Sequence, residues 1–161
     1  MREIVVIAHN IRSTHNVGSL FRTAEGFGVH KIILSGYTPY PESKNDSRLP
    51  HLSSKLTAQI HKTALGAEAL VPFEYIEVPD LQQLKNEGYR LVALEQDATS
   101  IMLSEYQPAE KIALLLGEEV HGVTDDLLAQ VDDIIEIPMV GHKESFNVSV
   151  AAGIALYALT I

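Results

Sequence analysis

The sequence predicts an α/β fold in which a mainly parallel sheet is flanked by helices. Short apolar runs rich in β-branched residues recur along the chain, and such runs are typical of strands buried on both faces. Segments with apolar residues at helical spacing separate these runs. Alternation of strands with helices favours parallel pairing. Because the 161 residues contain no repeat, low-complexity tract or long linker, we expect residues 1–161 to form a single domain.

The N-terminal elements can be assigned in order. A buried strand is expected over Glu3–Ala8, where four β-branched residues stand in a row. Asn16 is the predicted N-cap of a helix that Gly26 ends. The second strand is predicted over Lys31–Leu34. The polar stretch 35–53 is predicted to be a loop, and a loop this long in a compact domain is usually functional or mobile.

The remainder of the chain continues the alternation and ends in an apolar helix rich in small residues. The expected elements are a helix over Leu56–Ala69, a strand over Tyr75–Val78, a helix over Leu81–Asn86, strands over Arg90–Leu94 and Ile112–Leu116, a helix over Asp125–Val131, a strand over Ile134–Ile137 and a helix over Asn147–Ile161.

The composition excludes several classes of protein. Hydrophobic residues make up 46% and charged residues 20%, which is enough apolar material for a core and too much for a disordered chain. The absence of cysteine excludes a disulfide scaffold and a cysteine-built zinc or redox centre. There is no signal-peptide core, and no apolar run approaches the roughly 20 residues that cross a bilayer. We therefore expect a soluble, cytoplasmic protein without a membrane partner.

The net charge of −9 is unevenly distributed along the chain. Residues 1–62 hold eight basic and four acidic residues, a balance of +4, which leaves −13 for residues 63–161. A polyanionic partner is therefore expected to bind the N-terminal half. The alternative interpretation, that the charges merely scatter over solvated faces, fits the counts equally well.

Three polar segments, 9–18, 117–122 and 138–147, each follow a predicted strand. Ligands of open parallel sheets bind beyond the carboxyl ends of the strands, so these segments are the candidate site. None contains the dinucleotide or phosphate-binding glycine motifs, the G-x-S-x-G elbow or H-E-x-x-H, which disfavours Rossmann dehydrogenases, P-loop NTPases and α/β serine hydrolases. His121 and His142 have no third ligand at metal-binding spacing, and no metal is expected.

Taken singly, each candidate residue also has a structural interpretation. Asn16 and Arg22 are predicted to overlook one pocket, but an N-cap and a solvated arginine would show the same spacing. Glu119 is either a carboxylate that holds a cation or an ordinary surface acid. Ser145 and Asn147 are also suited to cap the final helix. The functional interpretation depends on explaining the three segments together.

Read together, the segments resemble the three motifs of the SpoU (TrmH-like) RNA 2′-O-ribose methyltransferases, a branch of the SPOUT class. Asn16–Ala24 has the sequence NVGSLFRTA, close to the family's N-x-G-x-x-x-R-x-A. Gly117–Gly122, GEEVHG, matches G-x-E-x-x-G. Ser145–Ala151, SFNVSVA, is similar to S-L-N-V-S-x-A, with Phe146 in place of leucine. The order and spacing also agree, from residue 3 to the C-terminus.

The resemblance implies a C-terminal trefoil knot, S-adenosylmethionine as cofactor and a homodimer. It also implies a 2′-O-methylated ribose in tRNA or rRNA as product. General topological rules disfavour a knot, but small residues such as Ala152 and Gly153 in the final helix would allow the tight packing it needs. The apolar character of that helix fits an interface between two copies.

The resemblance also assigns roles to individual residues. Arg22 corresponds to the arginine proposed as the family's base. Because an arginine has a pKa above about 12, we favour a clamp that holds the substrate phosphate and stabilises the forming alkoxide. The implied catalytic residues are Arg22, Asn16, Glu119, Ser145 and Asn147. The implied cofactor contacts are Leu94, Gly117, Ile137, Met139 and Ser145, with Gly117 lacking a side chain so that the cofactor can approach.

Many relatives carry an RNA-binding extension, and we expect none here, so the catalytic domain itself should contact RNA. Tyr37 and Tyr40 are available to stack on a base, although ordinary loop packing is an equal alternative. An accessory RNA-binding protein would compensate for the acidic second half. The expected phosphate contacts are Arg12, Arg22, Lys44, Arg48 and Lys55, joined by Arg2 and His51.

Two other functions are alternatives. The first is a non-catalytic knotted dimer that binds RNA or protein, which would fail to bind the cofactor. The second is a methyltransferase that acts on a non-RNA acceptor, which would keep its activity after RNA is digested away.

Overall fold

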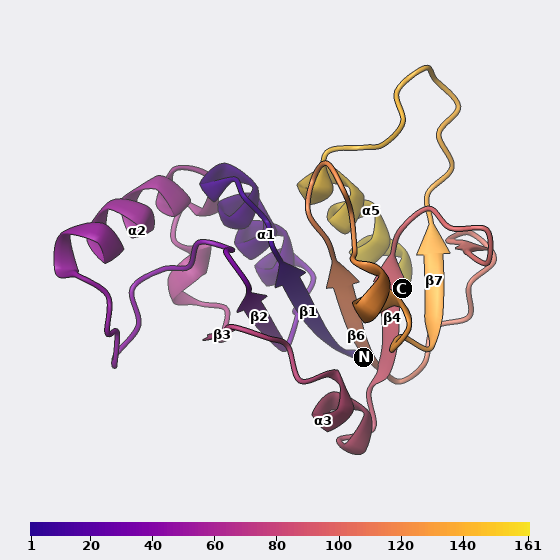
Figure 1. Ribbon diagram of the computed structural model, residues 1–161, viewed down its shortest axis with the longest axis horizontal. Coiled ribbons are helices and arrows are strands. Elements are labelled where there is room, and N and C mark those ends of the chain that lie inside the picture. The colour runs from indigo at the N-terminus through magenta and orange to yellow at the C-terminus, as the bar shows by residue number, and fades with distance from the viewer.

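The fold is built on one seven-stranded sheet, as the computed structural model of residues 1–161 shows. All strand pairings are parallel, and the order is β3-β2-β1-β6-β4-β7-β5. The predicted α/β class is thus confirmed (Figure 1). The strands are β1 (Glu3–His9), β2 (Lys31–Ser35), β3 (Phe73–Ile76), β4 (Arg90–Leu94), β5 (Ile101–Met102), β6 (Lys111–Leu116) and β7 (Asp133–Glu136).

Helices cover both faces of the sheet. One apolar cluster joins the sheet to α1 (Thr14–Gly26), α2 (Pro50–Ala64) and α5 (Val148–Thr160). A second, smaller cluster joins the opposite face to α3 (Leu81–Asn86) and α4 (Asp125–Leu128). A short 3₁₀ turn over Ala67–Ala69 follows α2. No helix is long and apolar enough to span a membrane.

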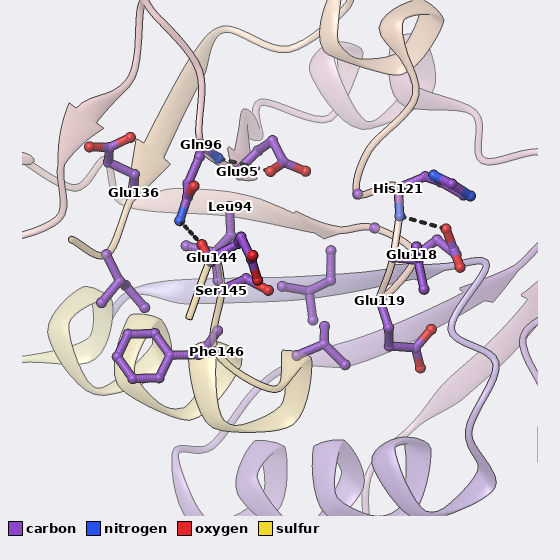
Figure 2. Close-up of a pocket in the computed structure, with 17 residues that line it drawn as sticks. Leu94, Glu95, Gln96, Glu118, Glu119, His121, Glu136, Glu144, Ser145 and Phe146 are labelled. Carbon is purple, nitrogen blue, oxygen red and sulfur yellow. Dashed lines mark hydrogen bonds between the residues drawn. The ribbon is translucent and has the colours of Figure 1, made fainter. Parts of the chain in front are cut away.

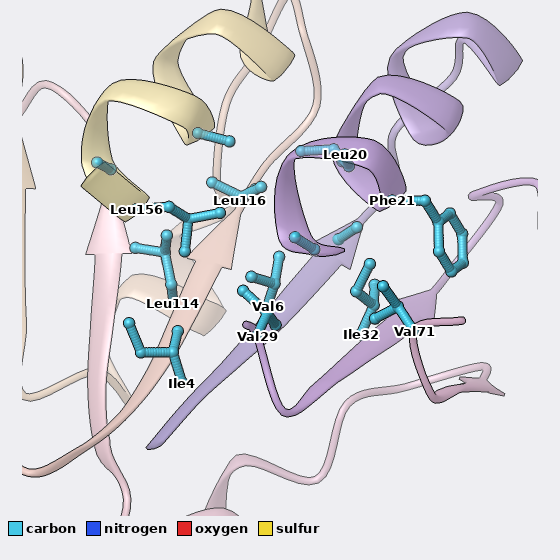
Figure 3. Close-up of a cluster of buried hydrophobic side chains, with 14 of the residues drawn as sticks. Ile4, Val6, Leu20, Phe21, Val29, Ile32, Val71, Leu114, Leu116 and Leu156 are labelled. Carbon is cyan, nitrogen blue, oxygen red and sulfur yellow. The ribbon is translucent and has the colours of Figure 1, made fainter. Parts of the chain in front are cut away.

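The alternation of side chains in β1 shows how the sheet forms two cores. Ile4 and Val6 point to the α1 and α5 side, and Val5 and Ile7 point to the α3 side. All four side chains are buried, which explains the unbroken apolar run in the sequence. Figure 3 shows the larger core, where Leu156 of α5 lies over the central strands.

The first helix begins earlier than predicted. Its N-cap is Ser13, whose side chain accepts a hydrogen bond from the backbone of Asn16 at 3.2 Å. The prediction that Asn16 is the N-cap was therefore wrong. Because Asn16 lies within the first turn, its own side chain is free to make contacts elsewhere. Further along α1, a Cβ added at Gly18 would lie within 3.0 Å of Thr63 and Ile60, so this glycine allows α1 and α2 to pack closely.

Element boundaries account for most other differences from the prediction, and the strand predicted over Tyr75–Val78, for example, is Phe73–Ile76. Instead of one helix over Leu56–Ala69, α2 starts at Pro50, which suits the first helical position, and it ends where Leu65 and Gly66 adopt positive φ angles. The predicted loop is correspondingly shorter. The helix predicted over Asp125–Val131 ends at Leu128. The edge strand β5 was not predicted.

The strand order places the candidate segments together. Successive strands β1, β2 and β3 extend to one side, whereas β4, β7 and β5 lie on the other side of β6. The side on which successive strands are added therefore switches between β1 and β6, and ligands of parallel sheets bind at such a switch point. The segment between β7 and α5 arches beyond the carboxyl edge before α5 packs back against the sheet (Figure 1). The trefoil knot stays a prediction.

Candidate active site

A cavity of about 270 Å³ lies beyond the carboxyl ends of β4, β6 and β7, against the start of α5 (Figure 2). This volume is close to the lower end of the range of about 300–1,000 Å³ found for small-molecule sites. The cavity is lined by Leu94, Glu95, Gln96, Leu116, Gly117, Glu118, Glu119, Val120, His121, Gly122, Glu136, Ile137, Glu144, Ser145, Phe146, Val148 and Ala151.

The predicted cofactor residues mostly line this cavity. Leu94, Gly117, Ile137 and Ser145 are all part of its wall, although they come from four different places in the sequence. Met139 is half-buried and is not among the lining residues, because the chain has already left the end of β7 at that point. Four of the five predicted contacts are thus brought together.

The turn after β6 closes on itself as a tight hairpin. The backbone N–H of Glu118 donates to Gly122 O at 3.1 Å, and the N–H of Gly122 donates to Glu118 O at 2.8 Å. A Cβ added at Gly117 would lie within 3.0 Å of the backbone of Gly122 and Val123. The hairpin itself therefore requires the missing side chain of Gly117, and the predicted approach of the cofactor to this glycine stays a prediction.

Glu119 is the centre of a polar network that joins all three motif segments. Its carboxylate accepts hydrogen bonds from the backbone of Arg12 and Ser13, at 3.2 and 3.3 Å, and from Asn16 Nδ2 at 3.2 Å. Asn16 Oδ1 in turn accepts from Asn147 Nδ2 at 3.1 Å. The β6 turn, the start of α1 and the start of α5 are therefore linked through side chains.

This network keeps Glu119 ionised. Burial raises the pKa of Glu119, but hydrogen bonds from the backbone of Arg12 and Ser13 and from Asn16 outweigh burial and leave the pKa below its ordinary value. A carboxylate with a lowered pKa is a weak proton acceptor. Glu119 is thus suited to fix the orientation of Asn16.

Asn147 both caps α5 and contributes to the polar network, two roles that the sequence analysis treated as alternatives. Its Oδ1 accepts from Ser149 N at 3.0 Å and from Ser149 Oγ at 2.6 Å, so it caps α5. Its Nδ2 donates to Asn16 in the network. Because the cap fixes Oδ1, it also aims Nδ2 at Asn16.

Arg22 does not join Asn16 in one pocket, and that prediction was wrong for the single chain. Residues six positions apart on a helix differ in direction by about 120°. Arg22 is exposed on the outer side of α1, with no hydrogen bond or ion pair. Arg22 is not part of the cavity wall, whereas Asn16 takes part in the network at the edge of the cavity.

A second, open cleft lies beyond the carboxyl ends of β1, β2 and β3. Arg12 and Tyr37 stand at its wall with their side chains largely exposed, and the Arg12 guanidinium lies 6.0 Å from the centre of the Tyr37 ring. Lys44 and Lys55 are exposed nearby in the sequence and form no ion pair. These four residues keep the accessibility that a contact with RNA requires.

Arg48 and Tyr40, by contrast, stabilise the loop between β2 and α2. The Arg48 guanidinium pairs with Asp46 at 2.6 Å, donates to the backbone oxygens of Tyr40 and Pro41, and is only 14% exposed. It also lies 3.5 Å from the Tyr40 ring, whose other face must hold Tyr75, stacked at 4.1 Å. Both side chains are therefore engaged within the chain, which disfavours the predicted phosphate contact of Arg48 and the predicted stacking of a base on Tyr40.

Arg2 is also engaged within the chain, because it donates to Leu159 O and Ile161 O. This engagement disfavours its predicted phosphate contact in the same way. His51 is exposed at the start of α2.

Several cavity residues were not predicted because no single motif contains them. Glu95 and Gln96 follow β4, and Glu136 ends β7, so only the sheet topology brings them together. Gln96 Nε2 donates to Glu144 O at 2.8 Å, which connects the segment after β4 to the arching segment before α5. Glu118 lies inside a motif, but its burial, which distinguishes it from a surface acid, cannot be inferred from the sequence alone. No group of three or more His, Asp or Glu side chains could hold a metal ion.

The architecture and the site have matches among known proteins. The model of the SpoU rRNA Methylase family matches residues 3–157, so the chain belongs to this family. A tRNA (guanosine(18)-2′-O)-methyltransferase of Aquifex aeolicus is 30% identical over 97% of this chain and 68% of its own length. A 23S rRNA (guanosine-2′-O-)-methyltransferase RlmB of Burkholderia sp is 32% identical over 96% of this chain and 57% of its own length.

A solved structure supports the fold. The AdoMet-bound rRNA methyltransferase of Sinorhizobium meliloti superposes with a TM-score of 0.79 and 23% identity, over 98% of this chain and 55% of that one. The chain thus spans between about half and two thirds of the length of these three proteins.

Proposed function

We propose that the protein transfers a methyl group from S-adenosylmethionine to a ribose 2′-hydroxyl of tRNA or rRNA. The observation that carries the proposal is the network Glu119–Asn16–Asn147, which joins the three motif segments at the edge of the cavity. Relatives named as tRNA and rRNA 2′-O-methyltransferases support the reaction and the class of substrate.

The cavity fits the cofactor in size and chemistry. Leu94, Ile137, Phe146 and Val148 offer an apolar wall for an adenosine, and glutamates offer negative charge to the sulfonium and the α-ammonium group. When bound, S-adenosylmethionine supplies an electrophilic methyl group on a sulfonium. We infer that Ser145 and the backbone near Gly117 hold its polar groups, since both line the cavity. The AdoMet-bound neighbour supports this choice of cofactor.

The chain's own residues would position the ribose and stabilise charge on its oxygen. Glu119, held ionised, fixes the Asn16 amide, and Asn147 fixes it from the other side. The Arg22 guanidinium is suited to clamp a phosphate and to stabilise a forming alkoxide. A phosphate oxygen of the RNA would then take the proton that the 2′-hydroxyl loses.

We also propose that two copies of the chain form a homodimer through α1 and α5. Val150, Ile154 and Tyr157 of α5 are 51%, 38% and 60% exposed, an apolar surface of the kind that marks an interface. These three residues line a shallow groove between α1 and α5. Ser149 lines the same groove and contacts Asn147, so the surface reaches the polar network. Because Arg22 lies outside the cavity of its own chain, we assign it to the site of the second copy.

RNA would approach over the second cleft, beside the network. Arg12 belongs to the cleft wall, and its backbone N–H donates to Glu119, so phosphate binding there occurs next to the site. We propose Lys44 and Lys55 as further phosphate contacts and Tyr37 as a stacking platform. Since the rest of the chain is acidic, we also propose that an accessory protein raises the RNA affinity. We also propose a cytoplasmic location, which a tRNA or rRNA substrate supports.

Methyl transfer from radiolabelled S-adenosylmethionine into unmodified tRNA and rRNA pools tests the proposal. We expect label in a 2′-O-methyl nucleoside, identified by mass spectrometry, and none after Asn16→Ala. Label that persists after RNA is digested would indicate a non-RNA acceptor. Absence of both label and cofactor binding would indicate a non-catalytic dimer and would refute the proposal.

A further inference from the structure

We propose that Glu118 makes the cofactor cavity selective for charge, so that it binds the cationic cofactor more tightly than the neutral thioether product. The inference rests on the proposed function and adds a specificity-determining residue to it. It concerns a carboxylate next to Glu119 that has no part in the network described above.

Glu118 is a buried carboxylate with one oxygen left free. The residue is 9% exposed and lines the cavity. Its Oε2 accepts a hydrogen bond from His121 N at 2.7 Å, and Figure 2 shows this contact at one end of the cavity. Its Oε1 accepts no hydrogen bond from the protein, and its nearest cation is Arg12, at 3.7 Å. Because the Arg12 side chain is 74% exposed, solvent screens that ion pair.

The surroundings of the cavity add to its negative charge. Glu95, Glu119, Glu136 and Glu144 line it as well, and no lysine or arginine does. Three of these four accept hydrogen bonds, and the donors to Glu119 are described above. Glu95 accepts from Gln96 N and Val123 N. Glu136 accepts from Ser100 Oγ. Glu144 is exposed on the arching segment. Among these five carboxylates Glu118 is the one that is buried, and one of its two oxygens has no hydrogen-bond donor.

The cofactor before and after methyl transfer differs in the charge on its sulfur, to which the negative charge of this cavity responds. S-Adenosylmethionine carries a positive sulfonium, whereas S-adenosylhomocysteine has a neutral sulfur and otherwise the same adenosine and amino-acid groups. A carboxylate of low solvent exposure attracts a cation more strongly than one in water, because screening is weaker there. The attraction is lost when the methyl group leaves. The cavity should therefore favour loading of the cofactor and release of the product.

Binding measurements with three matched ligands test the proposal. Isothermal titration calorimetry of the full chain would use S-adenosylmethionine, S-adenosylhomocysteine and sinefungin, an analogue with an ammonium group in place of the methyl sulfonium. We expect the two cations to bind at least about tenfold more tightly than S-adenosylhomocysteine. Glu118→Gln keeps an acceptor for His121 N and should reduce this ratio at least about threefold, with the affinity for S-adenosylhomocysteine changed less than about twofold.

Two further variants test the direction of the effect on the affinity ratio and provide a control. Arg12→Ala removes the nearest cation and should raise the ratio, opposite to Glu118→Gln. Glu144→Gln removes an exposed charge and should change the ratio less than Glu118→Gln does. The proposal is overturned if Glu118→Gln leaves the ratio unchanged, or if it weakens all three ligands equally, which would indicate a structural role. If the wild-type chain binds none of the three ligands, the proposed function fails as well.

Discussion

Gly117 has less room than any side chain needs. A Cβ there would lie within 3.0 Å of two backbone groups of the same hairpin, and backbone cannot move aside as a flexible side chain can. We predict that Gly117→Ala lowers the free energy of unfolding by about 1–3 kcal/mol, as overpacking does elsewhere. Urea denaturation measures this. Gly141→Ala is the control, because nothing lies within 4 Å of a Cβ there, and an equal loss for both variants would contradict the prediction.

The pKa of Glu119 gives a prediction about pH. Its pKa is lowered in the folded chain, so the network stabilises the fold above the ordinary carboxyl pKa, and this contribution is lost as the pH falls through the lowered value. We expect Glu119→Gln to cost about 1 kcal/mol at pH 7 and less at pH 3. Thermal unfolding at both values checks the sign. A difference that grows on acidification would show that the carboxylate does not stay ionised.

The start of α5 combines helix capping with site geometry, and the two can be separated. Asn147→Asp keeps an oxygen that caps the helix but loses the donor to Asn16. We expect stability within about 0.5 kcal/mol of the wild type and a loss of methyl transfer of about 100-fold. Asn147→Ala should lower stability by about 1 kcal/mol as well. Full activity in the Asp variant would show that the amide is not needed.

The loop between β2 and α2 should depend on a guanidinium and not merely on a positive charge. Arg48 donates to a carboxylate and two backbone oxygens at once, which a lysine cannot do. We predict that Arg48→Lys lowers the free energy of unfolding by about 1–3 kcal/mol. Lys44→Ala, on the same loop but without an ion pair, should leave stability unchanged and weaken RNA binding. The opposite pattern, in an unfolding and a filter-binding assay, would restore Arg48 as an RNA contact.

At the scale of the molecule, the apolar face of α5 predicts dimerisation. Ile154→Glu places a charge in the proposed interface, and we expect a monomer by light scattering, with methyl transfer lost and cofactor binding retained. A mixture of Arg22→Ala and Glu119→Gln chains then tests the origin of Arg22. If Arg22 serves the opposite copy, mixed dimers keep one intact site, and activity should recover to about a quarter of the wild type. No recovery would place Arg22 in its own chain's site.

The sequence predicts the centre of this fold better than its edges. The runs at Glu3–His9 and Arg90–Leu94 are buried on both faces, so the local pattern suffices. Strand β5 has two exposed residues and exists only because β7 pairs with it. The motifs likewise predicted that Asn16, Glu119 and Asn147 act together. Glu95 follows β4, Glu136 ends β7, and the engagement of Arg48 depends on how its loop folds, so none of these three has a local signal in the sequence.

The close approach of α1 and α2 at Gly18 bears on how this family could lose its chemistry. Gly18 and Gly117 are both required by packing, whereas the side chains of Asn16, Glu119 and Asn147 face one another at the site. A descendant that gave up catalysis would be free to change the three polar residues, but its glycines would stay under selection for folding. A search for inactive members of the lineage should therefore look for chains that keep both glycines and have lost the polar trio.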